Sequence, residues 1–137
     1  MRMKHTFSLV WIILVLISVF TWAGSAEPVV DVDLSACSRG ITYAQMIQVC
    51  NAPGEYDGKV FRLNGKFNYA VTQSTAKIIF SDKSGCCELA LPFDTAEALT
   101  YPDDYPPLYS DITITAWLTV DRSNPDLSCR FSDAIIE

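Results

Sequence analysis

Alternation of apolar and polar residues is the feature that most constrains how this chain can fold. From Ile112 to Val120 every second residue is apolar, and threonines and a tryptophan take the other positions. A second run, from Phe61 to Tyr69, alternates in the same way and carries Gly65 at its centre. A period of two puts alternate side chains on opposite faces of a strand, so both runs are predicted to be half-buried strands. Gly65 indicates a bulge or a tight bend within the earlier strand.

Three further segments, 77–81, 87–93 and 127–131, have the composition of strands. Five strands in about 80 residues, with a glycine in the first and an insertion between the third and fourth, are typical of an OB-fold barrel. The expected fold class is therefore mainly β, a five-stranded OB-fold-like barrel in which the third and fifth strands are parallel neighbours. A β-sandwich is the alternative, but that architecture usually requires seven strands.

One helix is predicted ahead of the barrel. Thr42 and Gln45 have the spacing of a capping box, which indicates that the helix begins at Thr42. Apolar residues then recur at helical spacing and form one face, which comprises Tyr43, Met46, Ile47 and Cys50. Pro53 and Gly54 end the helix. Cys50 is therefore predicted to be a core residue of the helix.

The N-terminus has the layout of a secretory signal peptide. A basic start precedes an apolar run from Phe7 to Trp22, and small residues follow up to Ala26. The run has about 16 residues, fewer than the 18 or more expected of a spanning helix, although an uncleaved anchor is the alternative. The predicted organisation is a signal peptide at 1–26 and one OB-fold-like domain at 27–137. The expected location is extracytoplasmic, with membrane contact only through an uncleaved N-terminus.

The predicted exported part is acidic. The whole chain has 10 basic and 16 acidic residues, and the signal segment removes only Arg2 and Lys4 from these counts, which leaves a net charge of −8. Such a surface repels phosphate backbones, so nucleic acid is not expected as a partner. The one histidine, His5, belongs to the signal segment. Its loss excludes Ser-His-Asp and Cys-His catalysis and histidine zinc sites from the exported domain.

Five cysteines lie in the predicted exported part: Cys37, Cys50, Cys86, Cys87 and Cys129. An odd number leaves at least one free thiol, and adjacent cysteines bridge each other only through a strained ring. Because the third and fifth strands would be neighbours, the sulfur of Cys129 is expected within about 7 Å of a sulfur of the Cys86-Cys87 pair, with Cys50 buried elsewhere.

Three interpretations of these sulfurs remain open. Cys86 or Cys87 forms a disulfide with Cys129, or the three thiolates hold zinc or copper(I), or all three are inert apolar side chains. In the metal interpretation Asp82, Glu88 or water supplies a further ligand. Cys87 is expected to point into the barrel and Cys86 outward.

Four motifs resemble a group of uncharacterised secreted bacterial OB-fold proteins. They are Tyr43-Ala44, Tyr56-Asp57-Gly58-Lys59, the Cys86-Cys87 pair followed by Leu91 and Phe93, and Tyr101-Pro102-Asp103-Asp104-Tyr105-Pro106. The resemblance extends from Thr42 to Ile136, and it departs at Pro92, where that group often has an acidic residue. It implies the fold and the extracytoplasmic location, and it implies no established activity.

Aromatic residues are the predicted ligand-binding side chains. Tyr101, Tyr105 and Trp117 would form a surface for a protein, peptide or glycan, as other OB-folds bind ligands on one face. Alternatively, the tyrosines pack over an open barrel end. Asp103 and Asp104 are adjacent and so make a poor acid–base pair.

Three classes of function follow from these residues. The preferred interpretation is a non-catalytic binding or interaction module without a cofactor. A thiol-based metal-binding or redox protein is second. An enzyme is third, because the fold alone implies no activity and the exported chain has no histidine base.

Overall fold

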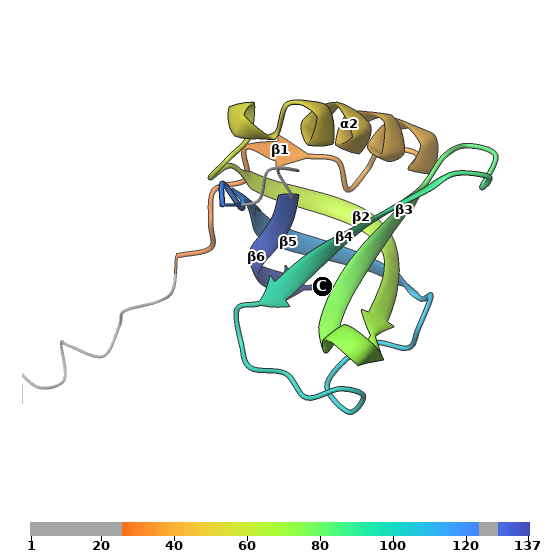
Figure 1. Cartoon of the computed structure of the whole chain (residues 1–137), viewed down its shortest axis with the longest axis vertical. Coiled ribbons are helices and arrows are strands. Elements are labelled where there is room, and N and C mark those ends of the chain that lie inside the picture. The colour runs from red at the N-terminus through yellow and green to blue at the C-terminus, as the bar shows by residue number, and fades with distance from the viewer. Residues whose placement is uncertain (1–25, 124–128) are drawn as a thin grey trace, which may run out of the picture.

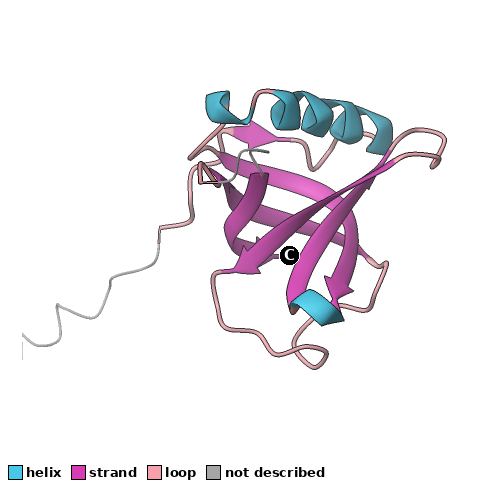
Figure 2. Cartoon of the chain, in the orientation of Figure 1, coloured by secondary structure: helices cyan, strands magenta, loops and turns pink. Residues whose placement is uncertain are grey.

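The computed structural model describes residues 26–123 and 129–137, in which the alternating segments form a barrel beneath a helix (Figures 1 and 2). The α-helix is α2 (Arg39–Asn51), and two short 3-10 helices are η1 (Pro53–Glu55) and η2 (Val71–Gln73). The strands are β1 (Val32–Asp33), β2 (Val60–Ala70), β3 (Thr75–Ser81), β4 (Glu88–Thr95), β5 (Asp111–Val120) and β6 (Cys129–Ile136).

Five of these strands close on themselves. The hydrogen-bonded order is β2-β3-β4-β6-β5, and pairing of β5 with β2 completes the ring. The predicted parallel pairing of the third and fifth barrel strands is confirmed, because β4 and β6 run parallel with Phe93 opposite Phe131. The short strand β1 lies outside the ring, parallel to the start of β2. One continuous closed sheet excludes the β-sandwich alternative.

The barrel interior is filled by the apolar half of each alternating run. Phe61, Leu63 and Phe67 of β2 are fully buried, as the sequence predicts. The other strands contribute a similar inward row, which comprises Ile78, Phe80, Leu91, Phe93, Ile112, Ile114, Ala116, Leu118, Cys129, Phe131 and Ala134. Burial of this apolar surface is the main favourable contribution to folding.

Gly65 lies where β2 passes from pairing with β5 to pairing with β3. Residues 60–66 of β2 pair with β5, whereas residues 66–70 pair with β3, so the strand changes partners at Lys66, next to Gly65. A Cβ atom at Gly65 would lie 2.6 Å from Cγ1 of Ile78 and 2.9 Å from the carbonyl oxygen of Ile79. Figure 1 shows β2 strongly curved, in agreement with the predicted bend, and at Gly65 its backbone approaches β3 too closely for any side chain.

The helix covers one end of the barrel (Figure 1). Its N-cap is Ser38, so α2 begins three residues before the predicted Thr42. Thr42 is not a cap but a buried residue, and its buried face continues through Met46 and Val49. The capping-box prediction is wrong because the Thr42 hydroxyl faces the barrel, within hydrogen-bonding distance of Asn64 Oδ1 at 3.3 Å.

Two observations concern membranes and export. Within residues 26–123 and 129–137, no helix combines the length and the apolar character required to cross a bilayer. The predicted signal peptide at 1–26 lies outside the described residues apart from Ala26.

Candidate functional site

A hollow of about 470 Å³ opens on the outside of the barrel beside the start of α2. Its wall comes from segments far apart in the sequence, which meet because β2 bends at Gly65 and changes partners there. The lining residues are Ser35, Arg39, Thr42, Asn64, Gly65, Lys66, Ile79, Phe80, Ser81, Asp111, Ile112, Thr113 and Glu137. A volume of this size is within the range of small-ligand sites.

Asn64 fixes the wall between α2 and β2. Its side-chain amide donates to the carbonyl oxygens of Ser35 at 3.0 Å and Cys37 at 3.4 Å. Its Oδ1 also accepts from the Thr42 hydroxyl at 3.3 Å. These bonds satisfy the polar groups between the helix and the barrel, and they hold the link from β1 to α2 against the strand.

The charges in the hollow are only partly balanced. Lys66 Nζ lies 2.7 Å from Asp111 Oδ1, and Glu137 makes a two-pronged ion pair with Arg62 at 2.5 and 3.0 Å. Arg39, which is exposed, has no ion-pair or hydrogen-bond partner for its side chain among residues 26–123 and 129–137. The guanidinium therefore leaves one uncompensated positive charge at the edge of the hollow.

The ion pair of Glu137 lowers its affinity for protons. The Arg62 guanidinium, followed by the hydrogen bond from the Thr115 hydroxyl at 3.1 Å, holds the pKa of Glu137 below its usual value. Both charged side chains are well exposed, so solvent screens the pair and limits its contribution to stability.

The predicted ligand-binding tyrosines lie against the barrel. The ring of Tyr101 stacks on Tyr69 with centroids 4.0 Å apart and an interplanar angle of 2°, and Tyr105 stacks on Phe67 at 5.4 Å. Both tyrosines are partly buried against the core. The loop that carries them covers the barrel end opposite α2 (Figure 1). The tyrosines thus pack over an open barrel end, which was the alternative to a ligand-binding surface. Their faces in contact with β2 are not available to a ligand.

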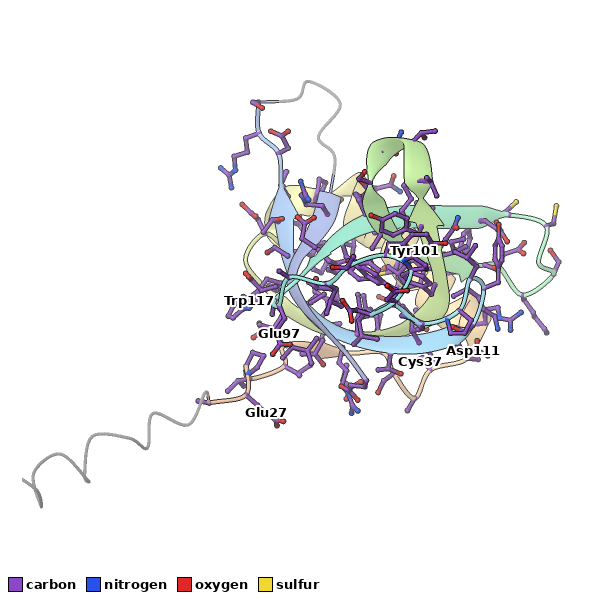
Figure 3. The ribbon with its side chains drawn as sticks, turned by 90° about the horizontal axis from the view of Figure 1, so that it is seen from below. Glu27, Cys37, Glu97, Tyr101, Asp111 and Trp117 are labelled. Carbon is purple, nitrogen blue, oxygen red and sulfur yellow. The ribbon has the colours of Figure 1, made fainter. Side chains whose placement is uncertain are left out.

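Trp117 belongs to a different part of the barrel. It is outward-facing, as predicted, and 39 % exposed. It is paired with Val60 at the start of β2, whereas Tyr101 stacks on Tyr69 near the end of that strand. Nine residues of strand span about 30 Å. Figure 3 shows Tyr101 and Trp117 well apart, so the three aromatic residues do not form one surface.

The Cys86-Cys87 pair lies in the turn between β3 and β4, and both side chains are exposed. The turn is organised by Asp82, whose carboxylate accepts the backbone N–H of Cys86 at 2.9 Å and the hydroxyl of Ser84 at 2.8 Å. These hydrogen bonds, the Ser84 bond first, lower the pKa of Asp82. The prediction that Cys87 points into the barrel is wrong, because β4 begins only at Glu88.

Cys129 lies beside Cys50. Its Sγ is 3.7 Å from Sγ of Cys50, so the prediction that Cys50 is buried elsewhere is wrong. Because Phe93 pairs with Phe131 in the parallel β4–β6 ladder, Cys129 lies level with Leu91. Leu91 is four residues beyond Cys87, and four residues of strand span about 13 Å. The structure therefore does not bring Cys129 to the Cys86-Cys87 pair. All five cysteines are free thiols.

Among the described ranges, no group of three cysteine, histidine or acidic side chains is arranged to hold a metal ion. Asp82 is engaged by its own turn, which removes one suggested ligand of the predicted zinc or copper(I) site. Asp104 likewise accepts the backbone N–H of Thr100 at 2.8 Å in an exposed loop. Asp82 and Asp104 thus each bind a backbone N–H group of their own turn or loop.

The hollow itself was not foreseen from the sequence. Arg39, Asn64 and Lys66 carry no motif, and each is an ordinary polar residue in its own segment. Only Gly65 signalled the bend that brings these segments together. Comparison with protein-family models, curated proteins and solved structures found no significant match.

Proposed function

We propose that this chain is a non-catalytic binding module of the OB-fold class that works outside the cytoplasm. The closed five-stranded ring, its strand order and the parallel β4–β6 pair support the OB-fold assignment. The signal-peptide layout of the first 26 residues supports export. The motifs shared with secreted bacterial OB-fold proteins agree with both.

One observation carries the proposal of a binding role. The hollow beside α2 combines a suitable volume with an unpaired guanidinium, at Arg39, and with polar side chains from β2, β3 and β5. A guanidinium recognises carboxylates through paired N–H donors. The ligand class that fits is a polar chain bearing a carboxylate, such as the C-terminus of a peptide or of an unfolded protein segment, or an acidic glycan.

A titration followed by NMR tests this role. Trialanine with a free C-terminal carboxylate should shift the backbone amide signals of Asn64, Ser81 and Thr113, and trialanine amide should shift them much less. Arg39→Ala should weaken the effect of the free carboxylate at least tenfold. Lys59→Ala is the matched control, because it removes the same charge from a residue outside the hollow. Equal binding by the Arg39→Ala variant would refute the assigned site.

Nucleic acid is proposed not to be the ligand, despite the OB-fold. Residues 27–137 carry a net charge of −8, which repels phosphate backbones and so opposes binding to nucleic acid. Fluorescence anisotropy with single-stranded DNA at physiological salt should give no submicromolar binding. Tight, salt-sensitive binding would contradict this part of the proposal.

Export is tested by intact mass spectrometry of chain recovered from cells. The expected mature chain begins near Glu27 and is found outside the membrane fraction. Recovery of uncleaved chain only with membranes would favour the anchor alternative.

A thiol function at the Cys86-Cys87 pair is the second candidate, and the exposure of both sulfurs supports it. Two adjacent exposed thiols are accessible to soft metal ions and to disulfide exchange. Native mass spectrometry with added zinc should distinguish the two candidates, because Cys86→Ser/Cys87→Ser would abolish a thiol-held ion and leave carboxylate binding at Arg39 unchanged.

A further inference from the structure

Two thiols that lie 79 residues apart in the sequence, those of Cys50 and Cys129, come together in the structure. Cys129 Sγ and Cys50 Sγ are 3.7 Å apart, with the Cys129 thiol placed to donate to the Cys50 sulfur. Cys129 is buried in the main core, and Cys50 is half-buried and packs against that core. A disulfide requires sulfurs about 2.05 Å apart, so side-chain adjustments of about 1.7 Å in total would join them.

Rigid elements hold this pair together. Cys50 is in the last turn of α2, immediately after Val49, which is 2 % exposed. Cys129 opens β6, opposite Val120 of β5 and two residues before the fully buried Phe131. Because each neighbour is anchored in the core, the proximity of the two sulfurs is set by the packing of the helix on the barrel.

We propose that Cys50 and Cys129 form the disulfide of this domain when the chain meets a disulfide oxidant, whether a small-molecule disulfide or an oxidoreductase carrying one. In the first step the sulfur of Cys50, the more accessible of the two, attacks the oxidant and releases one thiol of it. In the second step the sulfur of Cys129 attacks the sulfur of Cys50 and releases the other. Two cysteine thiols are thereby oxidised by two electrons, and the oxidant's disulfide is reduced to two thiols that take up the two protons.

The remaining cysteines are less suitable for this bridge. Cys86 and Cys87 are adjacent and exposed, in a turn about 13 Å along the strand from the level of Cys129. Cys37 lies ahead of α2, where its carbonyl oxygen accepts from Asn64. The bridge therefore uses two of the five thiols and leaves three free, which agrees with an odd cysteine count.

The environment of Cys50 makes the uncatalysed reaction slow. Burial, reinforced by the neighbouring Cys129, raises the pKa of the Cys50 thiol to about 12, so very little thiolate exists at neutral pH. Formation of the disulfide in the folded protein is thus expected to take minutes to hours in the presence of the oxidant. It should be faster while the chain is folding, when Cys50 is not yet buried.

Disulfide mapping tests the proposal. The purified chain is reduced, refolded, incubated with oxidised glutathione, and then alkylated with N-ethylmaleimide in denaturant before digestion and mass spectrometry. The expected product is a pair of peptides joined through Cys50 and Cys129, which separates on reduction, together with a loss of about 2 Da from the unalkylated intact mass. Cys129 joined to any other cysteine, or both residues fully alkylated after prolonged oxidation, would overturn the proposal.

A thermal melt with matched variants gives a second readout. The oxidised chain should melt several degrees above the reduced chain, and the Cys86→Ala/Cys87→Ala variant should retain this difference. Cys50→Ala, which removes a half-buried thiol and should still fold, is expected to lose the difference. An undiminished difference in Cys50→Ala would show that another bridge is responsible.

Discussion

Replacement of Gly65 by alanine tests the account of how the barrel bends. The added methyl group would lie 2.6 Å from Cγ1 of Ile78, 3.0 Å from its Cδ1, and 2.9 Å from the carbonyl oxygen of Ile79. Ile78 is fully buried, so its side chain has little room to move away. The carbonyl oxygen is part of the backbone of β3 beside β2, so it cannot retreat without disturbing the pairing of these strands.

The expected loss of stability follows from the contacts of the added methyl group with the Ile78 side chain and the Ile79 carbonyl oxygen. Inserting a methyl group into a packed core typically costs 1–3 kcal/mol, and the backbone contact favours the upper part of that range. We expect the free energy of unfolding to fall by about 2–3 kcal/mol and Tm to fall by about 10 °C. Gly54→Ala is the matched control, since a Cβ there meets no atom within 4 Å and Gly54 does not have a positive φ. That variant should be unchanged or stabilised by up to about 1 kcal/mol.

Urea denaturation followed by tryptophan fluorescence and by circular dichroism measures both variants. The midpoint should move to lower urea for Gly65→Ala while the dependence on urea stays the same, because the surface exposed on unfolding is unchanged. A loss of less than about 0.5 kcal/mol in Gly65→Ala would show that β2 does not approach β3 as closely as the structure has it.

Three further outcomes are expected. Glu137→Gln should cost at most about 1 kcal/mol at pH 7, since the pair with Arg62 is exposed. Because the folded-state pKa of Glu137 is lowered, its contribution is complete above about 4.5 and is lost as pH falls further, so stability curves of the variant and the parent should converge in acid. Tyr101→Ala should lose about 1–2 kcal/mol through the stack on Tyr69, whereas Tyr109→Ala, 63 % exposed, should change little in the same denaturation assay. With dithionitrobenzoate, the exposed thiols of the β3–β4 turn should react in the folded reduced protein well before the buried ones; simultaneous reaction of all five would contradict the burial described.

Most of the barrel was predictable because alternation is a local signal. The runs that became β2 and β5 have one face in the core, and burial on one side forces a period of two that can be read residue by residue. The parallel neighbours β4 and β6 followed from the predicted topology. The start of α2 was not predictable from the capping box, because the position of Thr42 is decided by Asn64, a contact across 22 residues.

The sites depend on contacts of that long-range kind, and they were largely missed. Cys50 and Cys129 meet because α2 packs across the end of the barrel where β6 begins, which no spacing within the helix or the strand encodes. The strand was predicted to begin at Cys87, one residue before β4 begins, since alternation does not show that Asp82 binds the following residues into a turn. The packing of the tyrosines was also not predictable from local sequence. The residues around an aromatic side chain in a loop do not indicate which part of the protein that side chain will contact.

The position of β6 in the ring has a consequence for biosynthesis. As the last strand of the sequence it lies between β4 and β5, so a chain that lacks it has two open sheet edges and no inward Phe131. During synthesis the domain therefore cannot close until the final residues of β6 have left the ribosome. Until β6 pairs with both neighbours, the edges of β4 and β5 stay open and the inner ends of the apolar core stay exposed.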